Sequence, residues 1–267
     1  MNFFVPWINA VAIVVGGGLG SILAQGKLSH IKYHSMLKQV CGVVIMGLGF
    51  LGAIQSFFVM DEGTLETKGT ILVVISLLMG WGLGEAFMID RALRKAGLWL
   101  EKRFVSEAGA GSKKSRTSAA DLKAAMEVID GKPNFSEGFV VAVTAICVGS
   151  MAIVGATESA GNTLYIKCLI DVILTFALSM LYGVGVAFAA IPLLIVECGL
   201  MALATWGGDF VTAAMIDQMA VIGSFMVLLT GVNLAFGKKI KAGNLVPALF
   251  IPILYYWIIE VSTKTAA

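Results

Sequence analysis

Long apolar runs separated by short polar segments make up most of this chain. Each run has about 15 to 22 residues, close to the roughly 20 apolar residues that an α-helix needs to cross the hydrocarbon core of a bilayer. The pattern predicts an all-α, polytopic transmembrane helical bundle, because a helix satisfies its backbone hydrogen bonds internally. We expect about eight spans, over residues 3–23, 40–60, 70–89, 138–156, 164–182, 184–205, 219–236 and 245–259.

The composition supports a membrane protein. Of the 267 residues, 58% are hydrophobic and 13% are charged, whereas about a quarter of the residues of a soluble domain are charged. The chain opens with an apolar run and no basic segment before it, so we interpret residues 3–23 as a retained span and not as a cleavable signal peptide. A single transmembrane domain over residues 1–267 is expected.

Lysine and arginine are concentrated in three segments. Cytoplasmic loops of membrane proteins carry an excess of these residues. Eight spans with both termini outside place all three segments inside, provided that the long run 164–205 is divided near Gly183-Val-Gly185. The three basic segments are residues 27–38, 91–116 and 238–241.

Residues 90–137 are the one sizeable extramembrane segment that the sequence predicts. Residues 90–104 have the pattern of an amphipathic helix, with Trp99 as an interface anchor, and residues 119–129 are a second helix candidate. A role in nucleic-acid binding is disfavoured, since the cytoplasmic flank of a span is basic in any case.

Two parts of the chain resemble each other. Residues 18–26 resemble residues 199–207, and Gly52 matches Gly231 further along. The match pairs spans 1–3 with spans 6–8, which would run in opposite directions and so form a candidate inverted repeat. Inverted repeats with interrupted helices are typical of secondary transporters, whose sites lie near the midplane. Chance matches of glycine and leucine are the alternative.

Two carboxylates lie inside predicted spans, Asp171 in the fifth and Glu197 in the sixth. An ionisable residue at membrane depth suggests a functional site. Asp171 is either a cation or proton site or the partner of Lys167, in an ion pair that reaches the outer interface. Glu197 has no basic residue at helical spacing, so it must be protonated, pair across helices or bind a cation. A third acid, Glu85, is expected to form a surface pair with Arg91.

Four neutral polar residues complete the candidate ligand- or ion-binding set: Asn9, Ser150, Thr175 and Asn233. Each could instead form an interhelical hydrogen bond. The sequence contains no recognisable nucleophile–base pair, nucleotide-binding loop or metal-ligand cluster, and its four cysteines form no C-x-x-C pair. We therefore expect no enzyme activity, no metal and no cofactor.

Several motifs follow one another along nearly the whole chain. They are Glu137-Gly-Phe, Cys147-Val-Gly-Ser-Met-Ala-Ile-Val-Gly155, Lys167-x-x-x-Asp171, Gly183-Val-Gly-Val186, Ile191-Pro192, Gly231-Val-Asn-Leu234 and Lys238-Lys-Ile-Lys-x-x-Asn244-Leu-x-Pro247-Ala248. In this order they resemble the bacterial YqgA/YdfK-type inner-membrane proteins, a domain-of-unknown-function family (DUF554).

The resemblance implies a polytopic protein of the bacterial plasma (inner) membrane and says little about activity. Three features depart from the family pattern. Val172 stands where the family usually has glycine, Glu197-Cys198 where it usually has Gln-Gly, and the segment 106–135 is longer than usual. The departure at Glu197 makes a charge-dependent mechanism shared by the whole family doubtful and points to a subgroup with a different ion preference.

The function that we expect is transport or conduction of a small polar solute or cation through a polar site near the midplane. The alternative is a membrane scaffold or sensor without transport activity that signals through residues 90–137. The expected partners are the lipid bilayer and the transported solute or cation, with no nucleic acid, and a homo-oligomer is left open.

Overall fold

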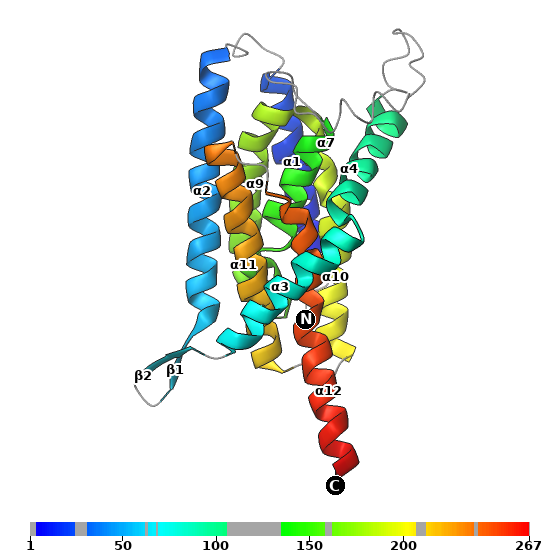
Figure 1. The fold of residues 1–267 in the computed structure, drawn as a ribbon. Coiled ribbons are helices and arrows are strands. Elements are labelled where there is room, and N and C mark those ends of the chain that lie inside the picture. The colour runs from blue at the N-terminus through cyan, green and yellow to red at the C-terminus, as the bar shows by residue number, and fades with distance from the viewer. Residues whose placement is uncertain are drawn as a thin grey trace.

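The computed structural model describes residues 4–24, 31–61, 64–67, 69–105, 135–157, 162–206, 212–237 and 240–266. These residues form a bundle of helices with several breaks and one small hairpin (Figure 1). The second predicted helix of the cytoplasmic loop, residues 119–129, lies outside the described residues. The elements are α1 (Phe4–Ala24), α2 (Ile31–Phe57), β1 (Phe58–Asp61), β2 (Thr64–Thr67), α3 (Thr70–Ala86), α4 (Ile89–Leu100), the π-helical η1 (Glu101–Val105), α7 (Phe135–Ala142), the π-helical η2 (Val143–Cys147), α8 (Ser150–Thr157), α9 (Asn162–Tyr182), the 3₁₀-helical η3 (Gly183–Ala189), α10 (Ala190–Trp206), α11 (Ala213–Phe236), the 3₁₀-helical η5 (Ala242–Phe250) and α12 (Ile251–Ala266).

The helices are long and apolar enough for a multi-pass membrane protein. Within the described ranges, five segments meet the length and hydropathy of a span, and a sixth results if α3 and the helix that follows it, bent by 57°, count as one broken span. The all-α transmembrane bundle is therefore confirmed, whereas the number of eight spans is not. The five segments are Pro6–Ala24, Ser35–Phe57, Tyr165–Trp206, Ala213–Phe236 and Ala242–Ile259.

Glycines let α1 pack closely along α9. A Cβ atom added at Gly16 would clash with Thr175, and one added at Gly20 would clash with Ser179. Small residues allow helix backbones to approach one another in this way inside membranes. Because the contacts advance together along both helices, α1 and α9 run parallel.

The chain reverses direction at Gly183. This residue has a φ of 78°, a left-handed conformation that glycine adopts without the steric penalty of a side chain. Asn9 of α1 contacts Glu197 of α10, whereas Gly17, farther along α1, faces Ala187 of η3. α10 therefore runs antiparallel to α1 and α9, and the division of the long apolar run near Gly183 is confirmed.

Helices that the candidate repeat pairs with each other are also neighbours in space. Gly42 of α2 lies against Ala235 of α11, and Gly49 lies against Leu228, so these two helices are antiparallel. α3 packs against η5 in the same antiparallel manner. Contact alone does not establish an internal repeat, which stays a prediction.

A two-stranded hairpin follows α2, at the end of the second predicted span and before the third. β1 and β2 pair antiparallel, with Phe58 opposite Thr67 and Asp61 opposite Thr64. The threonines and Val59 favour extended backbone because their side chains are branched at Cβ. The hairpin projects from the lower end of the bundle in Figure 1.

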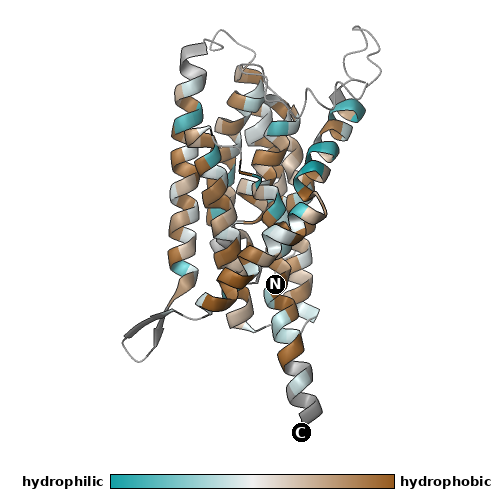
Figure 2. Cartoon of the chain, viewed as in Figure 1, coloured by the Kyte–Doolittle hydropathy of each residue, from teal (hydrophilic) through white to brown (hydrophobic). Residues whose placement is uncertain are grey.

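Charge is distributed unevenly between the two ends of the bundle. Hydrophilic residues are concentrated on the upper parts of the helices in Figure 2, above an apolar middle. In that middle, large apolar side chains such as Leu169 and Ile173 are 70% exposed, as expected for a surface that faces lipid. The described basic side chains of the upper end include Lys38, Arg91, Arg94 and Lys241.

Candidate functional site

Four polar side chains from three apolar helices meet in the interior of the bundle. α1 contributes Asn9, α9 contributes Lys167 and Asp171, and α10 contributes Glu197. None of the four is more than 4% exposed. We refer to these four residues as the buried charge cluster.

Lys167 lies between the two carboxylates of the buried charge cluster. Its Nζ donates a hydrogen bond to Asp171 Oδ2 and lies 3.4 Å from Glu197 Oε1. Asn9 Nδ2 donates a second hydrogen bond to the same Glu197 Oε1, at 2.8 Å. One ammonium group and one amide thus converge on Glu197 from two different helices.

The packing of α1 explains why these side chains meet. Asn9 lies seven residues, or about two helical turns, before Gly16, so both residues face the same side of α1. Lys167 and Asp171 are one turn apart on α9 and face the same side of that helix. The close glycine contact between α1 and α9 therefore holds Asn9 beside the lysine and the two acids.

The buried charge cluster has more acceptors than donors. One ammonium faces two carboxylates, which leaves one negative charge in excess when all three groups are ionised. Asn9 Oδ1 and Glu197 Oε2 are buried and have no hydrogen-bond partner within the part of the chain that the structure describes. Buried polar atoms are nearly always satisfied, so an unpartnered pair calls for an explanation.

The structure brings some of the predicted site residues together and places others elsewhere. It brings Asn9, Asp171 and Glu197 together. Thr175 is buried one turn beyond Asp171, but its hydroxyl donates to the Asp171 backbone carbonyl at 2.6 Å. Ser150 begins α8, and its side chain lies outside what the structure describes.

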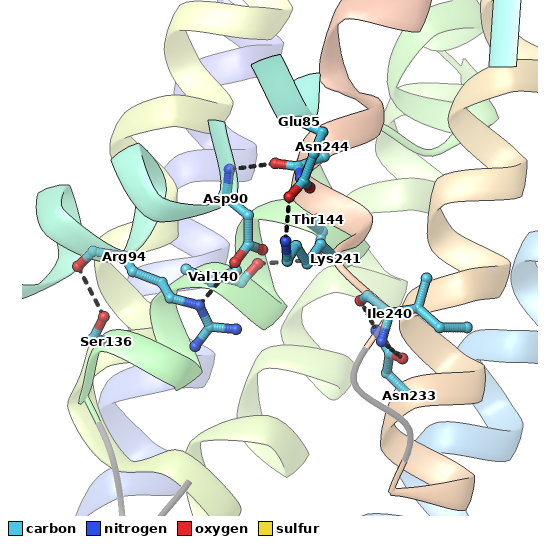
Figure 3. Close-up of polar contacts among 10 residues, drawn as sticks. All are labelled: Glu85, Asp90, Arg94, Ser136, Val140, Thr144, Asn233, Ile240, Lys241 and Asn244. Carbon is cyan, nitrogen blue, oxygen red and sulfur yellow. Dashed lines mark hydrogen bonds and ion pairs between the residues drawn. The ribbon is translucent and has the colours of Figure 1, made fainter. Parts of the chain in front are cut away.

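Asn233 lies away from the buried charge cluster. Its amide Nδ2 donates to the Ile240 carbonyl at 2.5 Å, and its Oδ1 accepts from the Ile240 amide at 2.9 Å. These two bonds hold together the ends of the connection between α11 and η5, so Asn233 shapes a turn (Figure 3).

Lys167 is the residue of the buried charge cluster that the candidate set lacked. The ion pair of Lys167 with Asp171 is confirmed, but a side chain only 4% exposed does not reach the interface, so that part of the expectation is wrong. The four-residue spacing indicated the pair. The contact of Lys167 with Glu197 depends on how α9 and α10 pack against each other, and no local sequence pattern indicates that packing.

A cavity of about 300 Å³ lies near the upper end of the bundle and is lined by apolar residues together with several polar and charged ones. Lys38 lies over the Tyr182 ring, 6.0 Å from its centroid, at one side of this cavity. We refer to it as the upper cavity. Its charged and polar lining includes Lys38, Asp90, Arg91, Arg94, Glu137, Thr144, Thr230, Asn233 and Lys241.

The junction between α3 and α4 is tied to the beginning of η5 beside this cavity. Glu85 accepts hydrogen bonds from Lys241 Nζ at 2.6 Å and from Asn244 Nδ2 at 2.5 Å. Asn244 Oδ1 in turn accepts from the Asp90 backbone amide at 2.8 Å. We call these four residues the polar clamp (Figure 3). Glu85 thus forms its direct ion pair with Lys241, which lies at the beginning of η5, whereas the predicted partner Arg91 interacts with it through charge alone.

A break in the helix explains the free amide that the polar clamp binds. Met88 has a φ of 53° between α3 and α4, an uncommon left-handed conformation for a residue other than glycine. The break leaves amide groups at the beginning of α4 without partners in the preceding helix. Asn244 supplies one acceptor, and Arg94 forms an ion pair with Asp90 at 2.9 Å on the next turn.

The chain is similar to a family of unknown function and to proteins that include a membrane protein. A family model described as "Protein of unknown function (DUF554)" matches residues 4–257. The "Uncharacterized membrane protein YdfK" of Bacillus subtilis (strain 168) is 25% identical over 256 residues, which cover 94% of this chain and 95% of that protein. The "Uncharacterized protein YqgA" of Escherichia coli (strain K12) is 22% identical over 258 residues, which cover 94% and 96%. No solved structure matches the chain.

Proposed function

Since the chain belongs to the DUF554 family, as its motifs predicted, and that family has no known function, we propose a function from the chain's own geometry. The protein is an integral membrane transporter or ion-conducting protein for a small polar solute or cation. The observation that carries this proposal is the buried charge cluster inside α1, α9 and α10.

Stability alone gives no reason for such a cluster. Removing an ionised side chain from water costs several kcal/mol after relaxation, and replacing a buried ion pair with packed apolar residues is often neutral or stabilising. Ionisable residues at membrane depth typically belong to ion pathways or proton relays. Two carboxylates and a lysine at that depth therefore support a role in ion or solute movement.

The upper cavity supports a route toward the buried charge cluster. Thr144 lines the cavity and belongs to η2. Cys147, three residues further along η2, is fully buried, and η2 packs against α10, the helix that carries Glu197. η2 therefore connects the lining of the cavity to a helix of the cluster, and π-helical turns occur frequently at functional sites.

The broken helices support a change of access between the two ends. Many transporters rock one helical group against another around a fixed site, with interrupted helices beside it. Here α3 and α4 bend by 57°, and η5 is a 3₁₀-helix in front of α12. The polar clamp joins these two irregular segments, so it is suited to hold one arrangement until its hydrogen bonds open.

The charge asymmetry supports an orientation in the bacterial plasma membrane. The basic residues that line the upper cavity lie toward the end of the bundle where hydrophilic residues are concentrated in Figure 2. Cytoplasmic segments carry an excess of lysine and arginine, so this end is assigned to the inside. Both termini would then face outside. Labelling of single cysteines introduced in the β1–β2 hairpin and at Lys241, with a membrane-impermeant thiol reagent on intact cells, tests this orientation. Labelling of the hairpin position alone is expected.

Transport assays in proteoliposomes test the function. The full chain is reconstituted, and uptake of a panel of labelled alkali cations and small polar solutes is measured. Asp171→Asn and Glu197→Gln should each abolish most of the uptake that the wild type shows, whereas Asp217→Asn, a half-buried acid on α11 outside the cluster, should preserve it. Wild-type uptake in both cluster variants would refute the assignment of the site.

A scaffold or sensor acting through residues 90–137 is the other hypothesis. Residues 106–134 lie outside the described part of the chain, so no structural observation favours it.

A further inference from the structure

We propose that the buried charge cluster binds one exchangeable proton, held on the carboxyl group of Glu197, and that this proton is the coupling ion of transport. The coupling rests on the proposed function, whereas occupancy by the proton does not. Nothing beyond the cluster itself is needed to hold the proton, because its acceptor atoms are already in place.

The charge balance of the cluster requires one further positive charge. Lys167 offsets only one of the two carboxylates that it contacts. Among the described residues, α1, η2, α8 and η3 contain no charged side chain, and α9 and α10 contain only the three already named. α2 and α7 also pack against α9, but their described charged residues, Lys38 and Glu137, line the upper cavity. An uncompensated buried charge is strongly unfavourable, and such sites bind a partner or become neutral.

The two unpartnered atoms indicate what kind of partner is missing. Asn9 Oδ1 and Glu197 Oε2 are both oxygens that accept hydrogen bonds. A further acceptor would satisfy neither atom, so the missing partner is a donor or a cation. Protonation of Glu197 Oε2 converts one of the two acceptors into an O–H donor and removes the excess charge in the same step.

A proton suits this position better than a metal cation does. The Lys167 ammonium already lies 3.4 Å from Glu197 Oε1, so a second cation beside this carboxylate would be repelled. Hard cations also need a shell of several oxygen ligands. Among the described residues, no group of three or more His, Cys, Asp or Glu side chains could hold a metal ion.

Glu197 is the carboxylate that holds the proton. Asp171 is directly hydrogen-bonded to Lys167, which lies one turn earlier on the same helix. Glu197 has the longer contact with Lys167 and the unpartnered Oε2. The buried Cys147 thiol donates to the Ala189 carbonyl, at 3.8 Å, and not to either carboxylate.

The exchange step is a single proton transfer. A proton that arrives from one end of the bundle bonds to Glu197 Oε2, and the cluster becomes electrically neutral. When the O–H bond breaks, the proton leaves toward the other end, both electrons stay on Oε2, and the Lys167 ammonium is again shared by two carboxylates. No other bond forms or breaks.

Infrared difference spectroscopy on the purified full chain in lipid tests occupancy without any transported solute. A protonated carboxyl group has a C=O stretching band that a carboxylate lacks. In the wild type, this band should disappear on alkaline titration. Glu197→Gln should lack it, Asp171→Asn should keep it, and Asn9→Leu should shift its frequency, because the Asn9 amide donates to this carboxyl group.

Three outcomes would overturn the proposal. The first is that the folded wild type shows no such band at any pH. The second is that Asp171→Asn removes the band and Glu197→Gln keeps it. The third is that adding sodium at constant pH removes the band. Should Glu197→Gln fail to fold, wild-type protein carrying ¹³C-labelled glutamate still separates the two acids, because the label shifts a glutamate band and leaves an Asp171 band in place.

A second measurement separates the proton site from transport. Proteoliposomes with a pH-sensitive dye inside should show proton movement with the wild type and not with Glu197→Gln. An infrared band with no proton movement in the wild type would confirm the proton site and refute the coupling. Proton movement that Glu197→Gln preserves would refute the coupling, whereas the infrared band alone decides whether Glu197 holds the proton.

Discussion

Two regions of this molecule use the same three types of side chain in different surroundings. In each, a lysine and an asparagine converge on a glutamate that comes from another segment of the chain. Inside the bundle the glutamate is fully buried, whereas at the upper end the lysine and glutamate side chains are 45% and 43% exposed. The inner set is Lys167, Asn9 and Glu197, and the outer set is Lys241, Asn244 and Glu85.

The difference between them shows how burial decides what such a set does. Water solvates the Lys241 and Glu85 side chains when their contact opens, so this pair of the polar clamp can form and break at small cost. The inner groups have only one another, so the loss of a member leaves an uncompensated charge. The inner set is therefore suited to bind an ion, and the outer set is suited to hold and release two segments.

The largest effect should follow from removing the lysine of the inner set. Lys167→Met leaves two buried carboxylates without a counter-charge and should destabilise the protein by about 3–5 kcal/mol. Unfolding in mixed detergent micelles measures the change. Lys241→Met is the matched control and should change stability far less. Equal effects of the two substitutions would show that burial does not separate the two sets.

An intermediate effect should follow from pushing α1 away from α9. Gly16→Leu forces a side chain against Thr175, which should cost about 1–3 kcal/mol or more and reduce uptake by moving Asn9 from Glu197. Gly18→Leu is the control, because no atom lies within 4 Å of a Cβ at that position. A Gly16→Leu protein with normal uptake would mean that the inner set does not depend on this packing.

A comparable effect on stability should follow from removing the amide of the outer set. Asn244 is 1% exposed and bonds both Glu85 and the Asp90 backbone amide. Asn244→Leu leaves that amide unsatisfied, which costs about 1–3 kcal/mol. We expect faster hydrogen exchange at the beginning of α4, measured by mass spectrometry. Unchanged hydrogen exchange there would show that Asn244 does not hold the beginning of α4 in place.

The smallest effect should follow from Glu85→Gln. This side chain is well exposed, so its pairing with Lys241 is screened by salt and contributes little to stability. The melting temperature in detergent should stay close to that of the wild type at high salt. A large decrease in melting temperature would show that Glu85 contributes to stability as strongly as the residues of the inner set.

Much of the fold was predictable because hydrophobicity and charge are recorded locally. The apolar runs gave the multi-pass bundle, and the balance of basic segments required the reversal that Gly183 makes. The number of spans is harder to predict, because breaks such as those at Met88 and in η2 depend on what packs beside them. The hairpin after α2 was missed, since an acidic loop and a short strand pair have similar compositions.

The buried charge cluster was predictable only in part. Apolar surroundings made Asp171 and Glu197 conspicuous, and helical spacing connected Asp171 to Lys167. The contact of Lys167 with Glu197 joins two helices that run in opposite directions, and the partner of Glu85 is 156 residues away along the chain. Such pairings follow from tertiary packing, which the local sequence does not record.

The tight reversal at Gly183 also bears on how the protein enters the membrane. α9 and α10 are separated only by the short η3, so the two helices are expected to leave the insertion machinery as one hairpin. Lys167 would then meet Glu197 before either side chain is exposed to lipid tails. A long polar linker inserted after Gly183 would separate the helices during synthesis, and glycosylation mapping should then show α9 failing to insert.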